Sequence, residues 1–321
     1  MRIPCLWEKL NIDKNKCSTK NDEINILSCF DGISCGRVAA ERAGLPLKKY
    51  FASEIEPHAE GVSKYNYPDI VRLGDINNYE SWDLPKIDLL IGGSPCQDLS
   101  IAKANSTGLK GSRSGLFFKY VDCLEKFTPK YFLLENNASM RKEDKDIISE
   151  ILGVEPIMIN SELVSAQSRK RLYWTNIPGV ELPEDKGILL KDIILSGKVD
   201  RNKSLCLARR YAGFSGSQSY MCRRYFGKSF GQPVFEGDIE AIRKMWKENP
   251  YFESDERNIR QMYHIECERL QTLPDDYTKY EITGDVVKET PTGIRYEMIG
   301  NAWTCDVIAH IFTYLKKELE K

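Results

Sequence analysis

The stretch ILSCFDGISCGRVAAERAG, residues 26–44, decides the fold because it joins an apolar run to a helical pattern through a turn. The continuous apolar character of ILSCF is typical of a strand that is buried on both faces. Gly32 and Gly36 let the backbone approach a ligand closely, at the place where open α/β sheets bind cofactors. The G-x-G-x-x-G pattern of nicotinamide and flavin sites is missing, which disfavours a dinucleotide oxidoreductase.

Outward from this segment, apolar runs alternate with helix-like stretches as far as residue 179. The runs are NILSCF (25–30), KKYFAS (48–53), IDLLIGG (87–93), KYFLLEN (130–136), EPIMIN (155–160) and RLYWTNI (171–177). Helices are predicted over residues 35–43, 115–127 and 304–320. This alternation predicts an α/β fold with a doubly wound, mostly parallel sheet.

The middle of the chain has a different character, and we interpret residues 180–262 as a small second lobe of loops and short strands. Between Arg201 and Phe235 there are seven basic residues and no acidic one, with seven aromatic residues interleaved. Glycines at 213, 216, 227 and 231 are expected to break any long helix. We therefore expect an extension over 1–22, a catalytic domain over 23–179, the lobe over 180–262, and a return to the catalytic domain over 263–321.

Composition narrows the functional classes. The 321 residues are 41% apolar, enough for a sizeable core, and the net charge of −1 means that a polyanion must be bound by a local basic patch. No apolar run has the length of a membrane span, and Met1–Asp22 has no signal-peptide stretch, so a cytoplasmic protein is expected. The ten cysteines lack C-x-x-C spacing, so we expect no metal site, and nine of them are interpreted as reduced core thiols. Cys96 is the exception.

Polar groups follow several of the predicted strands. Glu54 comes after the second run, where a carboxylate suits ribose hydroxyls, and Asp75 after Leu73-Gly74 can accept from an adenine amine. Together with the glycine turn, these groups form the pattern of an adenosine site.

Three further residue types suit chemistry on a pyrimidine ring. Cys96 lies in SPCQDLS (94–100) directly after an apolar strand, and Glu135 ends another strand. A thiolate that adds to carbon 6 of cytosine makes carbon 5 nucleophilic, provided that a positioned carboxyl group accepts charge at ring nitrogen 3. Arginines from QSRKR (167–171) can hold the carboxyl group and the base in place.

With these motifs in order, the chain resembles the DNA (cytosine-5) methyltransferases over nearly its whole length. It is most similar to the catalytic domain of the mammalian de novo enzymes, without their regulatory domains, so a bacterial or phage member is expected. The motifs are FDGIS (30–34), GGSPCQDLS (92–100), LLENN (133–137), QSRKR (167–171), RLQTLPDDYT (269–278) and GNAW (300–303).

The resemblance implies a class I fold that binds S-adenosyl-L-methionine and methylates a cytosine flipped out of double-stranded DNA. It implies that Cys96 is the nucleophile, that Glu135 engages nitrogen 3, that Arg169 supports both, and that Arg171 lies near the flipped nucleotide or its phosphate. The implied cofactor-binding residues, with Glu54 on the ribose and Asp75 on the adenine amine, are Phe30, Gly32, Ser34, Glu54, Ile55, Asp75, Ile76, Pro95, Asn301 and Trp303.

DNA contacts are expected from two segments. Residues 101–115 form a polar, glycine-rich stretch after the nucleophile that resembles a loop closing over a flipped base. In and before this loop we expect contacts from Gln97, Ser100, Lys103 and Arg113. In the basic lobe the candidates are Arg209, Arg210, Arg223, Arg224 and Lys228.

The sequence departs from the family pattern at two positions. Asn137 stands where the family usually has an apolar residue, and Ala302 and Trp303 stand in GNAW where GNSV is common. Two other functions stay open on the same fold: an RNA cytosine methyltransferase and a DNA-binding regulator without activity. A restriction partner, evasion of host defence by a phage and gene regulation are all compatible roles.

Overall fold

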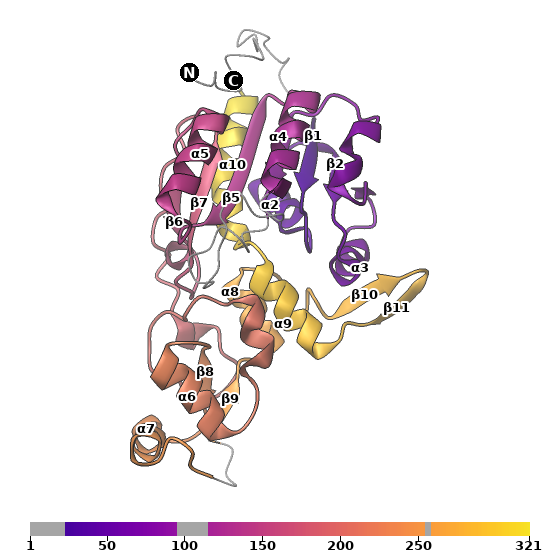
Figure 1. Cartoon of the computed structure of the whole chain (residues 1–321). Helices are drawn as coiled ribbons and strands as arrows, with labels where there is room; N and C mark the ends of the chain where they lie inside the picture. Colours follow the sequence, from indigo (N-terminus) through magenta and orange to yellow (C-terminus); the bar gives the residue numbers. More distant parts are fainter. Residues whose placement is uncertain (1–22, 95–114, 254–257) are drawn as a thin grey trace.

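The computed structural model describes residues 23–94, 115–253 and 258–321. Its centre is a seven-stranded sheet in the order β3-β2-β1-β4-β5-β7-β6, in which β7 alone runs antiparallel to its neighbours (Figure 1). The strands are β1 (Ile24–Cys29), β2 (Leu47–Ser53), β3 (Val71–Arg72), β4 (Leu89–Gly92), β5 (Tyr131–Asn137), β6 (Ile157–Asn160) and β7 (Lys170–Thr175). The predicted doubly wound, mostly parallel sheet is confirmed, and each apolar run overlaps one of its strands.

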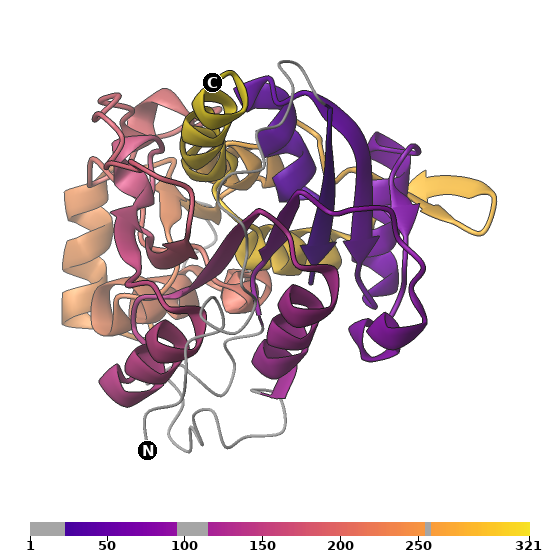
Figure 2. The same cartoon turned by 90° about the horizontal axis from the view of Figure 1, so that it is seen from above.

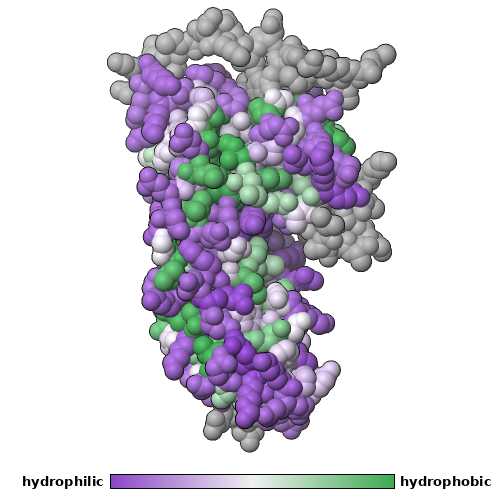
Figure 3. Space-filling model, turned by 90° about the vertical axis from the view of Figure 1, so that its left-hand side faces the viewer, coloured by the Kyte–Doolittle hydropathy of each residue, from purple (hydrophilic) through white to green (hydrophobic). Residues whose placement is uncertain are grey.

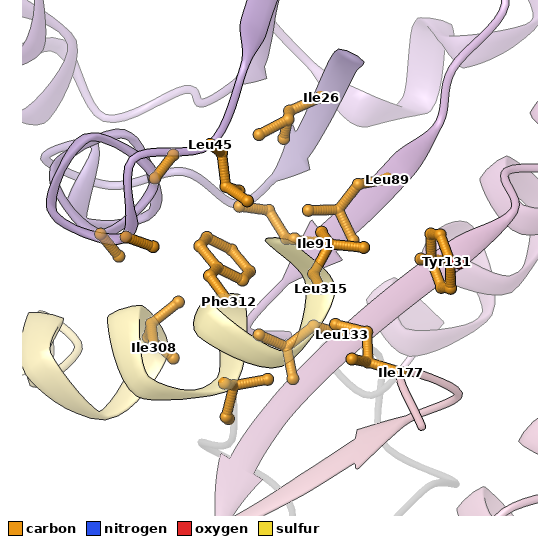
Figure 4. Packing of buried hydrophobic residues seen from close by; sticks show 14 of the residues in the cluster. Ile26, Leu45, Leu89, Ile91, Tyr131, Leu133, Ile177, Ile308, Phe312 and Leu315 are labelled. Carbon is orange, nitrogen blue, oxygen red and sulfur yellow. The ribbon is translucent and has the colours of Figure 1, made fainter. Parts of the chain in front are cut away.

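Helices cover both faces of the sheet, which explains why its strands are apolar throughout. Helices α2 (Cys35–Ala43) and α10 (Cys305–Leu319) lie on one face, and α4 (Gly115–Phe127) and α5 (Lys142–Leu152) on the other (Figure 2). The bounds of α2 and α4 are those predicted from the sequence. The close-up in Figure 4 shows Ile308, Phe312 and Leu315 of α10 pointing at the sheet. The C-terminal helix α10 therefore completes a core to which β1 also contributes.

Between the sheet and the lower lobe lie elements from the last part of the chain. They are α8 (His264–Leu270), the hairpin β10 (Tyr280–Thr283) and β11 (Val286–Glu289), and α9 (Thr292–Asn301). The hairpin projects from the body and packs on α3 (Pro57–Asn66) (Figure 1). Three 3-10 turns also belong to this framework: η1 (Ile76–Ser81), η3 (Ser161–Leu163) and η4 (Leu190–Asp192).

The basic segment folds as part of a lobe below the sheet (Figure 1). The prediction of loops and short strands is wrong in one respect, because the lobe contains helices, and Gly227 lies inside one of them. The elements are η5 (Arg209–Phe214), α6 (Gln218–Lys228), the paired strands β8 (Pro233–Phe235) and β9 (Ile259–Gln261), and α7 (Ile239–Glu248). Glycine costs about 1 kcal/mol in a helix interior, and near the last turn of α6 tertiary packing offsets that cost.

The core of the lobe is aromatic and extends beyond residue 262. Tyr211, Phe214 and Phe235 are buried in the same cluster as Tyr296 and Ile299 of α9. On the side of the molecule shown in Figure 3, the surface is mostly hydrophilic with separate hydrophobic patches. In the described residues, no helix is both long enough and apolar enough to cross a membrane.

Candidate active site

A cavity of about 750 Å³ opens at the carboxyl ends of the central strands. Sheets of this kind bind ligands at this edge, beside the point where the strand order reverses between β1 and β4. The wall is formed by residues 30–33 after β1, Glu54 after β2, residues 93–94 after β4, and residues 135–139 at the end of β5. Residues 169–171, 206–209 and 298–303 complete it from the lobe side. The volume suits a small-molecule ligand of cofactor size.

Glu135 is held from two sides within this cavity. Arg171 Nε lies 2.9 Å from its Oε1, and Trp303 Nε1 donates to its Oε2 at 3.0 Å. The side chains of Glu135 and Arg171 are only 12% and 13% exposed, so water screens this ion pair weakly. Each carboxylate oxygen of Glu135 thus accepts one bond from a side chain of the described residues, and a carboxylate oxygen accepts up to two.

The sheet register explains why Glu135 and Arg171 meet. β5 and β7 are antiparallel, with Glu135 opposite Tyr173 and Asn137 opposite Arg171. Side chains two positions apart on a strand point to the same face, so Glu135 and Arg171 are diagonal neighbours.

The structure gives Glu135 a different partner from the one that we predicted. We expected Arg169 to support Cys96 and Glu135, but Arg171 forms the ion pair with Glu135. The position of Arg171 near a flipped nucleotide or its phosphate stays a prediction. Arg169 is 4% exposed, and its guanidinium donates to the carbonyls of Leu207 (2.7 Å), Gly300 (3.2 Å) and Ala302 (2.9 Å). It therefore ties the lobe to the end of α9. Both arginines line the cavity, and the order of residues in QSRKR does not reveal which of them pairs with Glu135.

The strand that leads to the nucleophile motif lies next to Glu135. β4 pairs with β5 in parallel, with Gly92 opposite Leu134. Two residues after Gly92, the buried Ser94 is contacted by Asn136, whose Nδ2 donates to the Ser94 Oγ at 3.1 Å. Asn136 is a site residue that the sequence analysis missed, although it stands in LLENN.

Six predicted residues lie outside the described ranges, so the structure does not test their roles. They are Pro95, Cys96, Gln97, Ser100, Lys103 and Arg113.

Asn137, where the sequence departs from the family pattern, does not need an apolar neighbour. Its Oδ1 accepts the backbone N–H of Ser139 at 3.1 Å, in the turn that follows β5.

A tight turn after β1 forms the other end of the cavity. Phe30, Gly32 and Ser34 all have left-handed backbones, with φ of 59°, 58° and 62°. Positive φ at a residue other than glycine is uncommon and concentrates at functional sites. Gly32 donates its N–H to Glu54 Oε2 at 2.7 Å, which links this turn to the end of β2.

Asp31, a residue that the sequence analysis did not select, lies in the middle of this turn. Tyr50 Oη donates to its Oδ1 at 2.8 Å, and Ser34 Oγ donates to its Oδ2 at 2.5 Å. Burial raises the pKa of Asp31 to about 6, although hydrogen bonds from Ser28, Ser34 and Tyr50 act in the opposite direction. Only a contact analysis in three dimensions reveals such a group, since an isolated Asp in a turn carries no sequence signal.

Some of the predicted cofactor residues line the cavity and others do not. Phe30, Gly32, Glu54, Asn301 and Trp303 line the cavity. The others among the described residues are outside its wall: the hydroxyl of Ser34 is bonded to Asp31 and Ser63, Ile55 is 69% exposed, and Ile76 is buried. Asp75 accepts the N–H of Asn77 at 2.9 Å and so caps η1.

Cys206 corrects the expectation that all cysteines except Cys96 are core thiols. It is exposed toward the cavity, and Arg169 Nη1 lies 3.5 Å from its sulfur. Withdrawal from bulk water raises the pKa of this thiol, but Arg169 and Arg171 lower it more, so that its pKa lies below the ordinary value. Its position in the lobe, next to both arginines, depends on tertiary structure.

The predicted DNA contacts of the lobe lie on η5 and α6. Arg209 lines the cavity and pairs with Glu297 of α9, with Nη2 2.7 Å from Oε2. Arg210 and Lys228 are exposed, and Arg223 and Arg224 are half-buried. Lys203, part of the same basic segment, has a structural role instead, because its ammonium donates to the carbonyls of residues 162, 165 and 188.

Comparisons with known proteins agree with this architecture. The orphan methyltransferase M.Rho11sI of Bacillus phage rho11s is 29% identical over 191 residues, which are 55% of this chain and 38% of the relative. The type II methyltransferase M.NlaIV of Neisseria lactamica is 32% identical over 200 residues, 54% of this chain and 47% of the relative. The matched segment thus spans less than half the length of these curated relatives. Among solved structures, the Entamoeba histolytica methyltransferase EhMeth shares the fold, with a TM-score of 0.65 and 16% identity over 94% of this chain and 100% of that one.

A family match covers most of the sequence. It extends over residues 24–178 and 191–317 and therefore includes the strands, Glu135, both arginines and the end of α9. By this match, the chain belongs to the C-5 cytosine-specific DNA methylase family.

Proposed function

We propose that this protein transfers a methyl group from S-adenosyl-L-methionine to carbon 5 of a cytosine that is flipped out of double-stranded DNA. One observation carries the proposal most directly. Glu135, fixed by Arg171 and Trp303, lies in the cavity beside the strand that leads through Ser94 to Cys96. A carboxyl group beside the strand that precedes the Cys96 motif in the sequence supports this reaction, because methylation of carbon 5 requires both a carboxyl group and a thiol.

The residues at the sheet edge fit the proposed cofactor. The turn over residues 30–33 and Glu54 supply a compact backbone and a carboxylate with an open acceptor position on the cavity wall. We propose that Glu54 holds the ribose, that Asp75 holds the adenine amine, and that Asn301 and Trp303 lie on the methionine side. When bound there, S-adenosyl-L-methionine supplies an electrophilic methyl group.

In the proposed reaction, the thiolate of Cys96 bonds to carbon 6 of the cytosine. The electron pair of the C5–C6 double bond shifts into the ring toward carbon 5 and nitrogen 3, and nitrogen 3 takes a proton from Glu135, which carries that proton when the base is bound. Carbon 5 then bonds to the methyl carbon, and the electron pair of the broken methyl–sulfur bond stays on the sulfur of the donor. A water or hydroxide takes the proton from carbon 5, which restores the double bond and expels the thiolate of Cys96, and the proton on nitrogen 3 returns to Glu135. Arg171 and Trp303 keep the carboxyl group of Glu135 oriented toward the ring throughout.

In this proposal, catalysis and target recognition belong to different parts of the chain. Residues 23–179 and 263–321 form the catalytic domain, and residues 180–262 form the target-recognition lobe. The bacterial and phage origin of the curated relatives supports a setting in the cytoplasm of a bacterial or phage-infected cell.

Incubation with labelled S-adenosyl-L-methionine and either duplex DNA or tRNA tests the proposal. We expect label on carbon 5 of cytosine in DNA and none on tRNA, and the reverse distribution would make the protein an RNA methyltransferase. Duplex containing 5-fluorocytosine is expected to form a covalent adduct, since fluorine is not released as a proton is. In the Cys96→Ala variant the adduct and the methylation are lost while DNA binding remains. A Cys96→Ala variant with full activity refutes the mechanism.

A further inference from the structure

The arginines of the lobe fall into two groups according to their partners. Arg201, Arg209, Arg243 and Arg260 each form an ion pair with a carboxylate. In the described part of the chain, Arg210, Arg223 and Arg224 form no such pair, and they lie over aromatic rings. No carboxylate among the described residues neutralises their charge.

Two of these arginines share one aromatic ring. The guanidinium carbon of Arg224 lies 4.3 Å from the ring centroid of Phe230, and that of Arg210 lies 5.3 Å from the same centroid. We call these three residues the Phe230 cluster. Stacking on a ring limits the motion of a guanidinium while its N–H groups stay available at the rim. Nε of Arg224 is buried and has no hydrogen-bond partner in the structure.

The backbone fixes Phe230 in place. Gly231 has φ +79°, and a Cβ at this position would lie 2.2 Å from the ring of Phe214. The rings of Phe214 and Phe230 meet edge to face with centroids 6.2 Å apart. Phe230 is therefore attached to η5, and only glycine fits at the next position.

The Phe230 cluster is joined to the wall of the catalytic cavity through the backbone. Residues 206–209 line the cavity, and Arg210 is the next residue along the chain. Arg209 is anchored to Glu297, and the backbone of residues 208–209 packs directly against Gly300 of α9. The start of η5 thus has a fixed position relative to the site of methyl transfer.

Arg223 has different surroundings, although it neighbours Arg224 in sequence. Its guanidinium carbon lies 4.2 Å from the ring centroid of Tyr251, and Nη1 lies 3.4 Å from the carbonyl oxygen of Pro250. These contacts attach it to the segment after α7, away from Phe230. Tyr251 is 72% exposed, so the pair lies at the surface.

We propose that the Phe230 cluster reads a guanine in the recognition sequence, with the guanidinium groups of Arg210 and Arg224 donating to base edges, while Arg223 contacts the DNA backbone. The inference rests on the proposed function. Arginine is the side chain that pairs with guanine O6 and N7 through two hydrogen bonds, and a guanidinium held against an aromatic ring presents its planar fork in a defined orientation for that contact. An arginine that only neutralises a phosphate can remain flexible. It needs neither an aromatic ring that it shares with a second arginine nor a ring whose position is fixed by a neighbouring glycine.

The test compares conservative variants, because lysine keeps the charge but loses the planar fork. Wild type, Arg210→Lys, Arg224→Lys and Arg223→Lys methylate duplex DNA with random bases around cytosine, and bisulfite sequencing reports the preference. We expect the wild type to require a guanine besides the target. Arg210→Lys and Arg224→Lys lower the discrimination at that base roughly tenfold, with an unchanged salt dependence of binding. Arg223→Lys keeps the preference. Lys244→Ala, which removes an exposed charge on α7, is the matched control.

Each outcome has a defined meaning. Unchanged base preference in both Arg210→Lys and Arg224→Lys overturns the inference, and so does an equal loss of preference in Arg223→Lys. Binding of matched and guanine-substituted duplexes, followed by fluorescence anisotropy in a Cys96→Ala background, gives a readout that does not need turnover. Failure of the wild type to methylate any duplex would instead refute the proposed function, and the two failures are therefore distinguishable.

Discussion

Trp303 donates a hydrogen bond from Nε1 to Oε2 of Glu135 at 3.0 Å, across 168 positions of the sequence. Both residues line the cavity, Glu135 on the proposed base side and Trp303, which follows α9, on the proposed cofactor side. One bond therefore connects the two halves of the site. Because Arg171 holds the other carboxylate oxygen, the side chain of Glu135 is fixed before any ligand enters.

Trp303→Phe is expected to lower kcat roughly tenfold, since a hydrogen bond to a charged group contributes about 1.5–3 kcal/mol. Phenylalanine keeps the packing against the sheet but has no N–H. The KM for DNA is expected to change little, because Trp303 orients the carboxylate and does not bind DNA. Single-turnover methylation measures the effect, and an unchanged rate with saturating cofactor contradicts the assigned role.

Substitutions of Arg169 and Arg171 are expected to have different effects on stability and on kcat. Arg169→Met leaves three buried carbonyls without a donor and is expected to lower the free energy of unfolding by about 2–4 kcal/mol. Arg171→Met removes the partner of Glu135 and is expected to lower kcat about a hundredfold with a smaller loss of stability. Urea unfolding and initial rates on the same two variants make the comparison. Equal stability losses would show that Arg169 is no more structural than Arg171.

Gly300→Ala is expected to disturb the packing of the lobe against α9. A Cβ at Gly300 would lie 2.5 Å from the carbonyl carbon of Ala208 and from the backbone nitrogen of Arg209, where neither side can yield without a backbone shift. Overpacking of this kind costs about 1–3 kcal/mol. Gly293→Ala in the same helix is the matched control, because a Cβ there meets nothing within 4 Å. Thermal unfolding and DNA affinity are expected to fall in the first variant only.

The carboxyl group of Asp31 is expected to make stability depend on pH. Burial raises its folded pKa from 3.8 to about 6, so the folded protein binds more protons than the unfolded chain between these values. The contribution of Asp31 to stability is complete below pH 3.8 and is lost as the pH rises through about 6. Urea unfolding from pH 4.5 to 7.5 measures it as the difference between wild type and Asp31→Asn. A difference that does not vary over this range would mean that Asp31 titrates normally.

Much of the fold was predictable from the sequence because it depends on local patterns. The apolar runs predicted every strand of the large sheet except β3, and helical spacing predicted α2 and α4 with the bounds that the structure has. The lobe was harder to predict, since α6 contains Gly227 and packs on a buried aromatic cluster. Intrinsic helix propensities do not include the free energy of such tertiary packing.

The sequence by itself determined that the chain is a member of its family, that Glu135 lies near the end of a strand, and that basic residues gather in the middle of the chain. Only the tertiary structure decided that Arg171 pairs with Glu135, that Arg169 instead supports the lobe, and that Arg210 and Arg224 share the ring of Phe230. The physical reason is that residue type and spacing fix which chemistry is available. Which groups come within hydrogen-bond distance depends on strand register and on how the lobe packs against α9, and both are set by contacts between residues far apart in the sequence.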